Sequence, residues 1–96
     1  MNLYRISQSE NNDYDTYDSA VVAAPDEATA RSIHPVDNII WNAEKSAWCY
    51  KKTGELEFHL ASTWCKHPDA VAVTLIGTAH SSITQPGVIL ASFNAG

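Results

Sequence analysis

The pattern of apolar and polar residues near the start of the chain predicts a hairpin of two strands. Residues 2–8 show the two-residue period of a half-buried strand, and residues 17–24 divide into two faces in the same way. Between them, residues 9–15 are dense in Ser, Asn and Asp, which favour turns. We therefore expect two antiparallel strands joined by a long tip.

A short helix is predicted directly after the second strand. Pro25 suits the first position of a helix, and the two acidic residues that follow it complement the helix dipole. The helix must end near Ile33 or His34, because the residue before Pro35 is pushed out of the helical region. These positions allow only about two to three helical turns.

The middle of the chain predicts a second hairpin, with residues 52–54 as its turn and Gly54 in a left-handed conformation. The predicted register pairs Lys51 with Glu55, Tyr50 with Leu56, Cys49 with Glu57, and Trp48 with Phe58. In this register the aromatic side chains share one face and the charged side chains share the other. Trp48 is then a core residue, while Trp41 and Trp64 either cover the edge of the core or form an exposed patch.

Two further strands are predicted in the last third of the chain. Residues 70–78 alternate between two faces, and residues 87–93 are almost continuously apolar. Such a continuous run is typical of a strand buried on both faces, so we expect it near the centre of the sheet, beside the first strand. The sequence thus predicts a single α+β domain over residues 1–96. Its antiparallel or mixed β-sheet has about four to six strands, with one short helix packed on one face.

The composition predicts a folded domain and indicates where in the cell we expect the protein. The chain has 96 residues, 45% hydrophobic and 18% charged, which is ordinary for a globular protein and argues against disorder. The longest apolar stretches are far shorter than the roughly 20 residues of a membrane span. The N-terminus lacks the basic and apolar regions of a secretory signal, so we expect a cytoplasmic protein that does not enter a membrane.

The net charge of −5 is concentrated in the first part of the chain. Residues 1–37 carry seven acidic and two basic residues, whereas residues 38–96 carry four of each. A nucleic-acid binder needs a basic surface to displace counterions from phosphates. The distribution therefore argues against a nucleic-acid partner.

The first predicted loop is the strongest candidate for a binding site. Residues 10–18 hold four acids, two tyrosines and no base. Tyrosines provide rigid contact area, and carboxylates attract a basic partner. The candidate binding residues are Glu10, Asp13, Tyr14, Asp15, Tyr17 and Asp18. The alternatives are a loop whose Asn and Asp residues serve turn geometry alone, or a calcium site, although EF-hand spacing is absent.

A metal-dependent or thiol enzyme is the alternative function. Its candidate residues are Cys49, His59, Cys65 and His67. Their spacing, C-x9-H-x5-C-x-H, matches no paired-knuckle zinc pattern, and no nucleophile motif surrounds any of them. Buried thiols and exposed histidines explain the same residues. We therefore assign no catalytic residue, no metal site and no cofactor.

The two ends of the chain resemble a known family. Residues 14–24 read YDTYDSAVVAA, and residues 87–96 read GVILASFNAG. These segments resemble a family of short, uncharacterised bacteriophage and prophage proteins, over roughly residues 2–35 and 70–96. The resemblance implies a phage accessory protein in the cytoplasm of a bacterial host, but no site residue. Together with the acidic loop, it favours a module that binds a host or phage protein over an enzyme.

Overall fold

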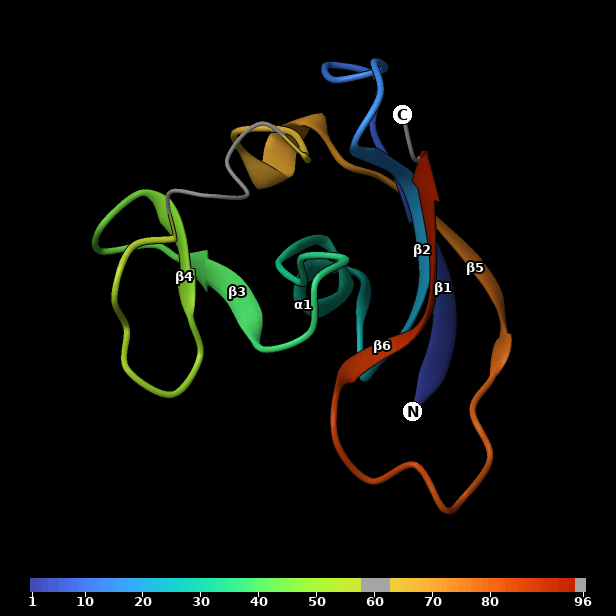
Figure 1. The fold of residues 1–96 in the computed structure, drawn as a ribbon. Helices are drawn as coiled ribbons and strands as arrows, with labels where there is room; N and C mark the ends of the chain where they lie inside the picture. Colours follow the sequence, from blue (N-terminus) through green and yellow to red (C-terminus); the bar gives the residue numbers. More distant parts are fainter. Residues whose placement is uncertain (58–62, 95–96) are drawn as a thin grey trace.

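The computed structural model describes residues 1–57 and 63–94 of the chain (Figure 1). In chain order the elements are β1 (Asn2–Ser7), β2 (Thr16–Ala24), α1 (Glu27–Arg31), β3 (Ile39–Asn42), β4 (Ala47–Tyr50), the 3₁₀ turn η1 (Pro68–Ala70), β5 (Ala72–Thr78) and β6 (Gly87–Asn94). Over the described residues, the six strands form two antiparallel sheets, accompanied by one short α-helix. The predicted α+β class is confirmed.

The larger sheet has the strand order β5-β1-β2-β6, and every neighbouring pair is antiparallel. The first hairpin forms as predicted: Tyr4 lies opposite Val22, and Ile6 lies opposite Ala20. All four of these side chains are buried, because this face of the sheet carries the core. The alternation in β1 and β2 thus decides which face turns inward.

Helix α1 follows β2 and contacts β1, β2 and β5. It begins with Asp26 as the N-cap, whose side chain accepts a hydrogen bond from the Thr29 N–H at 2.8 Å. Pro25 therefore precedes the cap, and the prediction that it is the first helical residue is wrong. At the other end, Arg31 donates a hydrogen bond to the Val71 carbonyl, which ties the helix to the start of β5.

Strand β6 lies at the edge of the sheet, beside β2, so its predicted central position next to β1 is wrong. Val88 and Ala91 pack against the core, whereas Leu90 is 68% exposed. The continuous apolar run therefore reflects burial on one face only. β5 forms the other edge, beside β1.

The second hairpin differs from the prediction. Gly54 adopts the expected left-handed conformation, with φ of 72°. The pairing, however, sets Cys49 opposite Leu56, not opposite Glu57. A slip of one residue moves each side chain to the other face of the hairpin. Leu56 is accordingly exposed and Glu57 buried.

β4 pairs instead with β3, a strand that the sequence pattern did not indicate. A tight connection joins the two strands: the Asn42 Oδ1 accepts a hydrogen bond from the Lys45 N–H at 3.1 Å, and Ser46 takes a positive φ of 49°. Phe58, the predicted partner of Trp48, lies outside the described residues. The β3–β4 sheet therefore takes the place of the predicted central hairpin.

The small sheet and the large sheet form two layers, with α1 between them in the view of Figure 1. Trp48 and Trp64 are buried in the core that joins the layers, and the Trp48 Nε1 donates a hydrogen bond to the Cys65 carbonyl at 2.8 Å. Trp41 is half-buried and packs against Trp48 with the ring centroids 5.4 Å apart. Trp48 and Trp64 therefore belong to the core, and Trp41 covers its edge. Within the described residues, helices are too short to cross a bilayer.

Candidate functional site

The loop between β1 and β2 folds around the buried side chain of Gln8. Its Nε2 donates hydrogen bonds to the carbonyls of Asn11 at 2.8 Å and Tyr17 at 2.9 Å. Its Oε1 accepts a hydrogen bond from the Asn11 N–H at 2.9 Å. Because Gln8 directly follows the last residue of β1, these three hydrogen bonds fold the loop back onto the sheet.

The far side of the loop is attached to the end of β6. The Thr16 hydroxyl and the Asn94 Nδ2 both donate to the Asp13 carbonyl, at 2.6 and 3.2 Å. The Asp15 N–H donates to the Asn94 carbonyl at 2.6 Å. Asp15 has a positive φ of 61°, a conformation that aspartate tolerates better than most residues. The loop backbone is thus fixed at several points on β6 and β2.

A third set of contacts joins the loop to residues more than 50 positions away. The Asn11 Nδ2 donates to the Trp64 carbonyl, and the Glu10 Oε2 accepts from the Lys66 N–H at 2.9 Å. The Glu10 carboxylate therefore satisfies a backbone group of the 63–67 segment. Glu10 therefore has a structural role in the fold in addition to its predicted place in the binding set.

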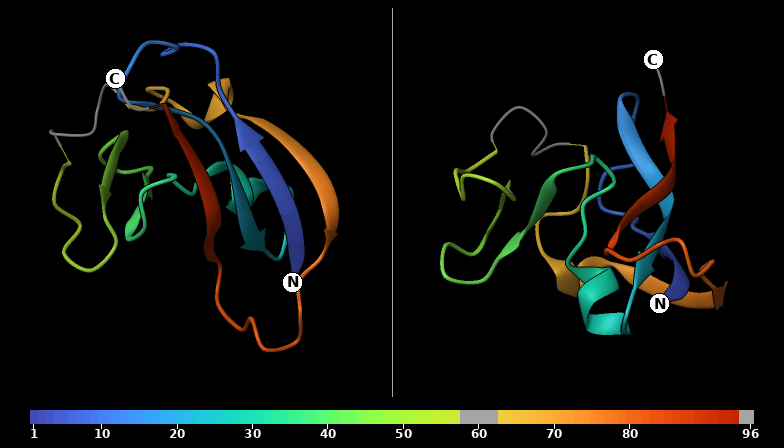
Figure 2. Two further views of the ribbon diagram at one scale, coloured as in Figure 1. Left: turned by 45° about the vertical axis from the view of Figure 1, so that its right-hand side comes forward. Right: turned by 90° about the horizontal axis from the view of Figure 1, so that it is seen from below.

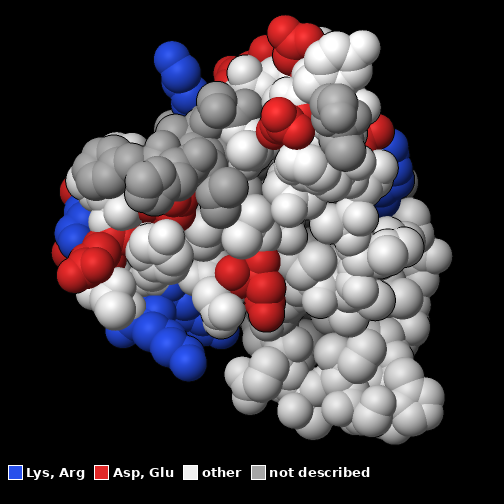
Figure 3. Space-filling model, in the orientation of Figure 1, with Lys and Arg blue, Asp and Glu red and all other residues white. Residues whose placement is uncertain are grey.

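The six predicted binding residues do not share one role. Tyr17 is half-buried and packs against Phe93 in a tilted arrangement, with the ring centroids 4.8 Å apart. Tyr14, in contrast, is 70% exposed. The exposed members other than Glu10 form what we name the acidic loop surface: Asp13, Tyr14, Asp15 and Asp18. In Figure 3, acidic side chains lie at the end of the molecule that carries this loop.

Sequence reasoning missed Phe93, which is 46% exposed beside the loop. Its position opposite Tyr17 in the pairing of β2 with β6 brings it there. The signal that could have found it is the aromatic residue at the end of an otherwise aliphatic strand. The strand order needed to use that signal was predicted incorrectly.

Three of the four residues proposed for an enzyme lie in the described part of the chain: Cys49, Cys65 and His67. Cys49 and Cys65 are both free and buried, and burial raises the pKa of the Cys65 thiol to about 11. A thiol with such a pKa is almost entirely protonated near neutral pH and is a poor nucleophile. His59 lies outside the described residues. Among residues 1–57 and 63–94, no three His, Cys, Asp or Glu side chains are grouped to hold a metal ion.

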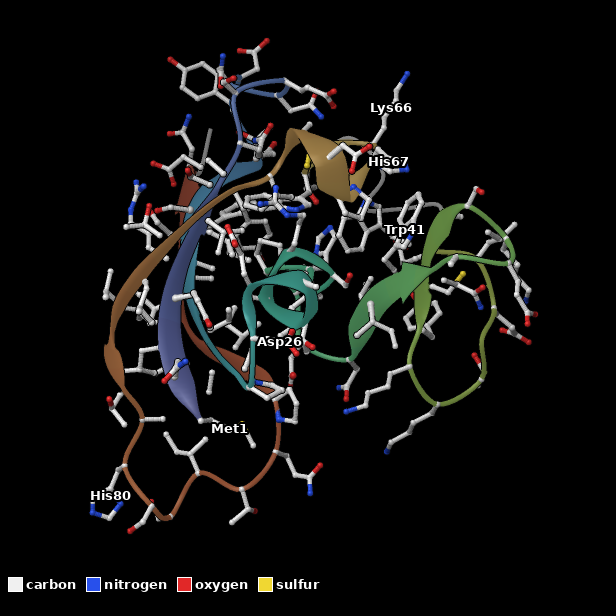
Figure 4. The ribbon with its side chains drawn as sticks, turned by 180° about the vertical axis from the view of Figure 1, so that it is seen from behind. Met1, Asp26, Trp41, Lys66, His67 and His80 are labelled. Carbon is white, nitrogen blue, oxygen red and sulfur yellow. The ribbon has the colours of Figure 1, made fainter. Side chains whose placement is uncertain are left out.

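His67 is exposed and packs on Trp41, with the ring centroids 4.7 Å apart (Figure 4). Its Nδ1 accepts a hydrogen bond from the Asp69 N–H at 3.1 Å, so the ring caps η1. This hydrogen bond occupies Nδ1 alone among the two ring nitrogens. The arrangement explains His67 as a cap for a turn that leads into β5.

A cavity of about 230 Å³ lies between α1, β3 and the start of β6, and sequence reasoning did not predict it. Its lining residues include the apolar Ile33, Ile40 and Val88, with Asp37 and Lys51 among the polar ones. A sharp turn after α1 forms part of the cavity wall, and Asn38 in this turn has a positive φ of 71°. The apolar pair Ile39 and Ile40 after a turn-rich segment was the available signal.

His34 forms part of the cavity wall and is only 2% exposed. Its Nδ1 accepts a hydrogen bond from the Val36 N–H at 3.0 Å. Burial lowers the pKa of the imidazole to about 4, so the ring is neutral near pH 7. The cavity wall is therefore uncharged at this position.

The chain was compared with protein-family models, curated proteins and solved structures. None of the three comparisons finds a match. The functional conclusion therefore depends on the geometry of the acidic loop surface and of the cavity.

Proposed function

We propose that this chain is a protein-binding module that uses the acidic loop surface to bind a host or phage protein with a basic surface. The resemblance of the chain's two ends to bacteriophage and prophage proteins suggests a phage accessory protein in the bacterial cytoplasm. The single observation that carries the proposal is an exposed aromatic residue, Tyr14, on a loop whose backbone is held by partly buried hydrogen bonds.

A loop fixed in this way is suited to binding. Ordering a flexible loop on association costs conformational entropy, and a preformed loop avoids most of that cost. The bonds from Gln8, Thr16 and Asn94 reach main-chain atoms of the loop, so they leave the Tyr14 ring available for contact. A large exposed tyrosine with two rotatable side-chain bonds then supplies contact area at low entropic cost.

The charge around Tyr14 indicates the chemistry of the partner. Between Arg5 and Arg31 the sequence has six acidic residues and no basic residue. Such a field attracts a basic surface and raises the rate of encounter, most strongly at low salt. We therefore expect the partner to present Lys or Arg around a site that accepts an aromatic ring.

The first prediction concerns the acidic loop surface. The variant D13N/D15N/D18N keeps the shape of the loop, because asparagine also tolerates the positive φ at position 15. We expect it to fold normally and to bind the partner at least about tenfold more weakly, owing to the loss of three carboxylates. Affinity capture from a bacterial lysate, followed by titration with the purified partner, measures the effect.

A matched control changes the net charge by the same amount elsewhere. The variant E44Q/E55Q/D69N removes three exposed carboxylates from other surfaces and should bind the partner as the wild type does. Y14A tests the aromatic contact separately and should also weaken binding. Equal capture of the same partner by the wild type, the triple Asp variant and Y14A would show that residues 10–18 are only a connecting loop.

The cavity supports a second candidate function, the binding of a small apolar molecule. Its volume of about 230 Å³ exceeds the roughly 150 Å³ that accommodates benzene in an apolar protein cavity. It is smaller than the sites of about 300–1,000 Å³ that hold drug-sized ligands. A compound with one ring and a short substituent matches the space.

The second prediction is that single-ring apolar compounds bind in this cavity. We expect them to shift the amide resonances of Ile33, Ile40 and Val88 in NMR titrations. I40W fills the cavity and should abolish the shifts, whereas L56W adds the same bulk at an exposed position away from the cavity lining. Shifts that persist in I40W, or that never occur across a fragment library, would contradict this function.

A further inference from the structure

The cavity between α1, β3 and the start of β6 combines apolar walls with two charged side chains (Figure 1). Asp37 and Lys51 are the charged members of its described lining, and both are exposed. The wall contributed by residues 86–88 belongs to a different kind of segment, because residues 70–96 contain no Asp, Glu, Lys or Arg. The charge of the cavity therefore lies where the turn before β3 meets the end of β4.

A backbone hydrogen bond brings the two charged residues close together in the fold. The Lys51 N–H donates to the Asn38 carbonyl at 2.7 Å, so Lys51 lies beside the turn that carries Asp37. Within residues 1–57 and 63–94, neither charged side chain forms a salt bridge. A carboxylate and an ammonium group are thus both available to a ligand at one edge of the cavity.

We propose that the ligand of this cavity is a free amino acid with one aromatic ring. The inference rests on the second candidate function, the binding of a small apolar molecule, and it assigns the polar part of that molecule. The ring occupies the space lined by Ile33, Ile40 and Val88. The α-carboxylate of the ligand pairs with the Lys51 ammonium group, and its α-ammonium group pairs with the Asp37 carboxylate.

The two opposite charges at one edge favour an amino acid over other single-ring compounds. A free amino acid carries an ammonium group and a carboxylate on the same carbon atom, so it can satisfy Asp37 and Lys51 together. An aromatic amine or an aromatic acid can satisfy only one of them. Because both side chains are exposed, the ion pairs stay in contact with water and avoid the large cost of burying charge. The apolar ring alone enters the part of the cavity that excludes water.

The third prediction is that phenylalanine binds more tightly than two analogues that carry a single charge. Phenylpropanoate has the same ring and chain but lacks the ammonium group, and phenylethylamine lacks the carboxylate. We expect each missing group to weaken binding by about two- to fivefold, the size that an exposed ion pair supports. NMR titrations that follow the amides of Ile33, Ile40 and Val88 measure the three affinities. Low salt is required, because salt screens exposed charges.

Two variants assign the ion pairs one at a time. K51Q should weaken the binding of phenylalanine and phenylpropanoate and leave that of phenylethylamine unchanged. D37N should weaken the binding of phenylalanine and phenylethylamine and leave that of phenylpropanoate unchanged. The matched controls K52Q and E44Q each remove an exposed charge outside the cavity lining and should change none of the three affinities. Circular dichroism should show all four variants folded.

The outcomes separate this inference from the function on which it rests. Phenylalanine that binds no more tightly than either analogue, or variants K51Q and D37N that weaken all three compounds equally, would overturn the assignment of an amino acid. Binding of uncharged toluene in that case would still support an apolar ligand. If neither toluene nor the three charged compounds shift the resonances of the wild-type cavity, both proposals fail. The acidic loop surface lies outside the cavity lining, so partner capture is an independent result.

Discussion

The burial of His34 depends on the packing of the two layers against each other. Its ring meets Trp48 edge to face, with the centroids 5.4 Å apart, and lies 6.2 Å from the ring of Trp64. The Val36 N–H donates to its Nδ1, so the neutral ring carries its proton on Nε2. The sequence showed a histidine before a proline, but its burial follows from aromatic residues that lie far along the chain.

The fourth prediction follows from this burial. The pKa of His34 falls from 6.5 to about 4, so the folded state favours the neutral ring. Above pH 6.5 the ring is neutral in both the folded and the unfolded chain, and it makes no pH-dependent contribution. As the pH falls from 6.5 to 4, the unfolded chain takes up a proton that the folded chain does not. Stability should therefore decrease by up to about 3 kcal/mol over this range.

Urea unfolding at several pH values measures this decrease. H34Q should lose most of the pH dependence between 6.5 and 4, whatever its stability at pH 7. H80Q, which replaces an exposed histidine, should keep the wild-type dependence. An unchanged slope in H34Q would show that other groups cause the loss.

At the scale of elements, the loop between β1 and β2 depends on Gln8. The fifth prediction is that Q8A, which removes three hydrogen bonds, lowers the free energy of unfolding by about 1–3 kcal/mol. Amide exchange in residues 9–15 should accelerate, while the core of β1 and β2 stays protected. N12A removes only the exposed hydrogen bond to the Ser9 carbonyl and serves as the control. Equal exchange in both variants would contradict the role of Gln8.

The sequence pattern predicted those elements whose signal is local. The first hairpin, the short helix and β5 follow from alternation and turn residues within a few positions. β3 has only four residues, and its identity depends on pairing with β4. In the central hairpin Gly54 determined the turn, but the register followed from which faces the rest of the fold covers, with Glu57 inside and Leu56 outside.

The candidate site, like the fold, was predicted only where its signal is local in the sequence. The composition of residues 10–18 was enough to predict an acidic loop that contains tyrosines. It could not separate Tyr14 from Tyr17, since that distinction depends on Phe93 in the neighbouring strand. The contact of Glu10 with Lys66 and the cavity also arise from long-range packing. Such contacts have no counterpart in the local pattern of residues.

At the scale of the whole molecule, the two layers are joined by aromatic rings. Neighbouring rings in this series lie 4.7 to 6.4 Å apart, in the order Phe93, Tyr17, His34, Trp48, Trp41 and His67. The series begins on the edge strand of the large sheet and ends beside η1. Burial of the inner rings, His34 and Trp48, stabilises the small sheet, which has only two strands and would be marginal alone.

The whole molecule also separates the acidic loop from the outer strands of the larger sheet. The acidic loop lies at one end of this sheet, while the edge strand β5 runs along its side (Figure 2).

The way in which Gln8, Thr16 and Asn94 hold the loop also affects how the protein can change over time. All three side chains bond to main-chain atoms, which every amino acid possesses. Substitutions at the exposed Asn12 and Tyr14 therefore need not alter the course of the backbone. The loop can diversify its outer side chains to follow a partner that evolves, while the framework beneath it stays the same.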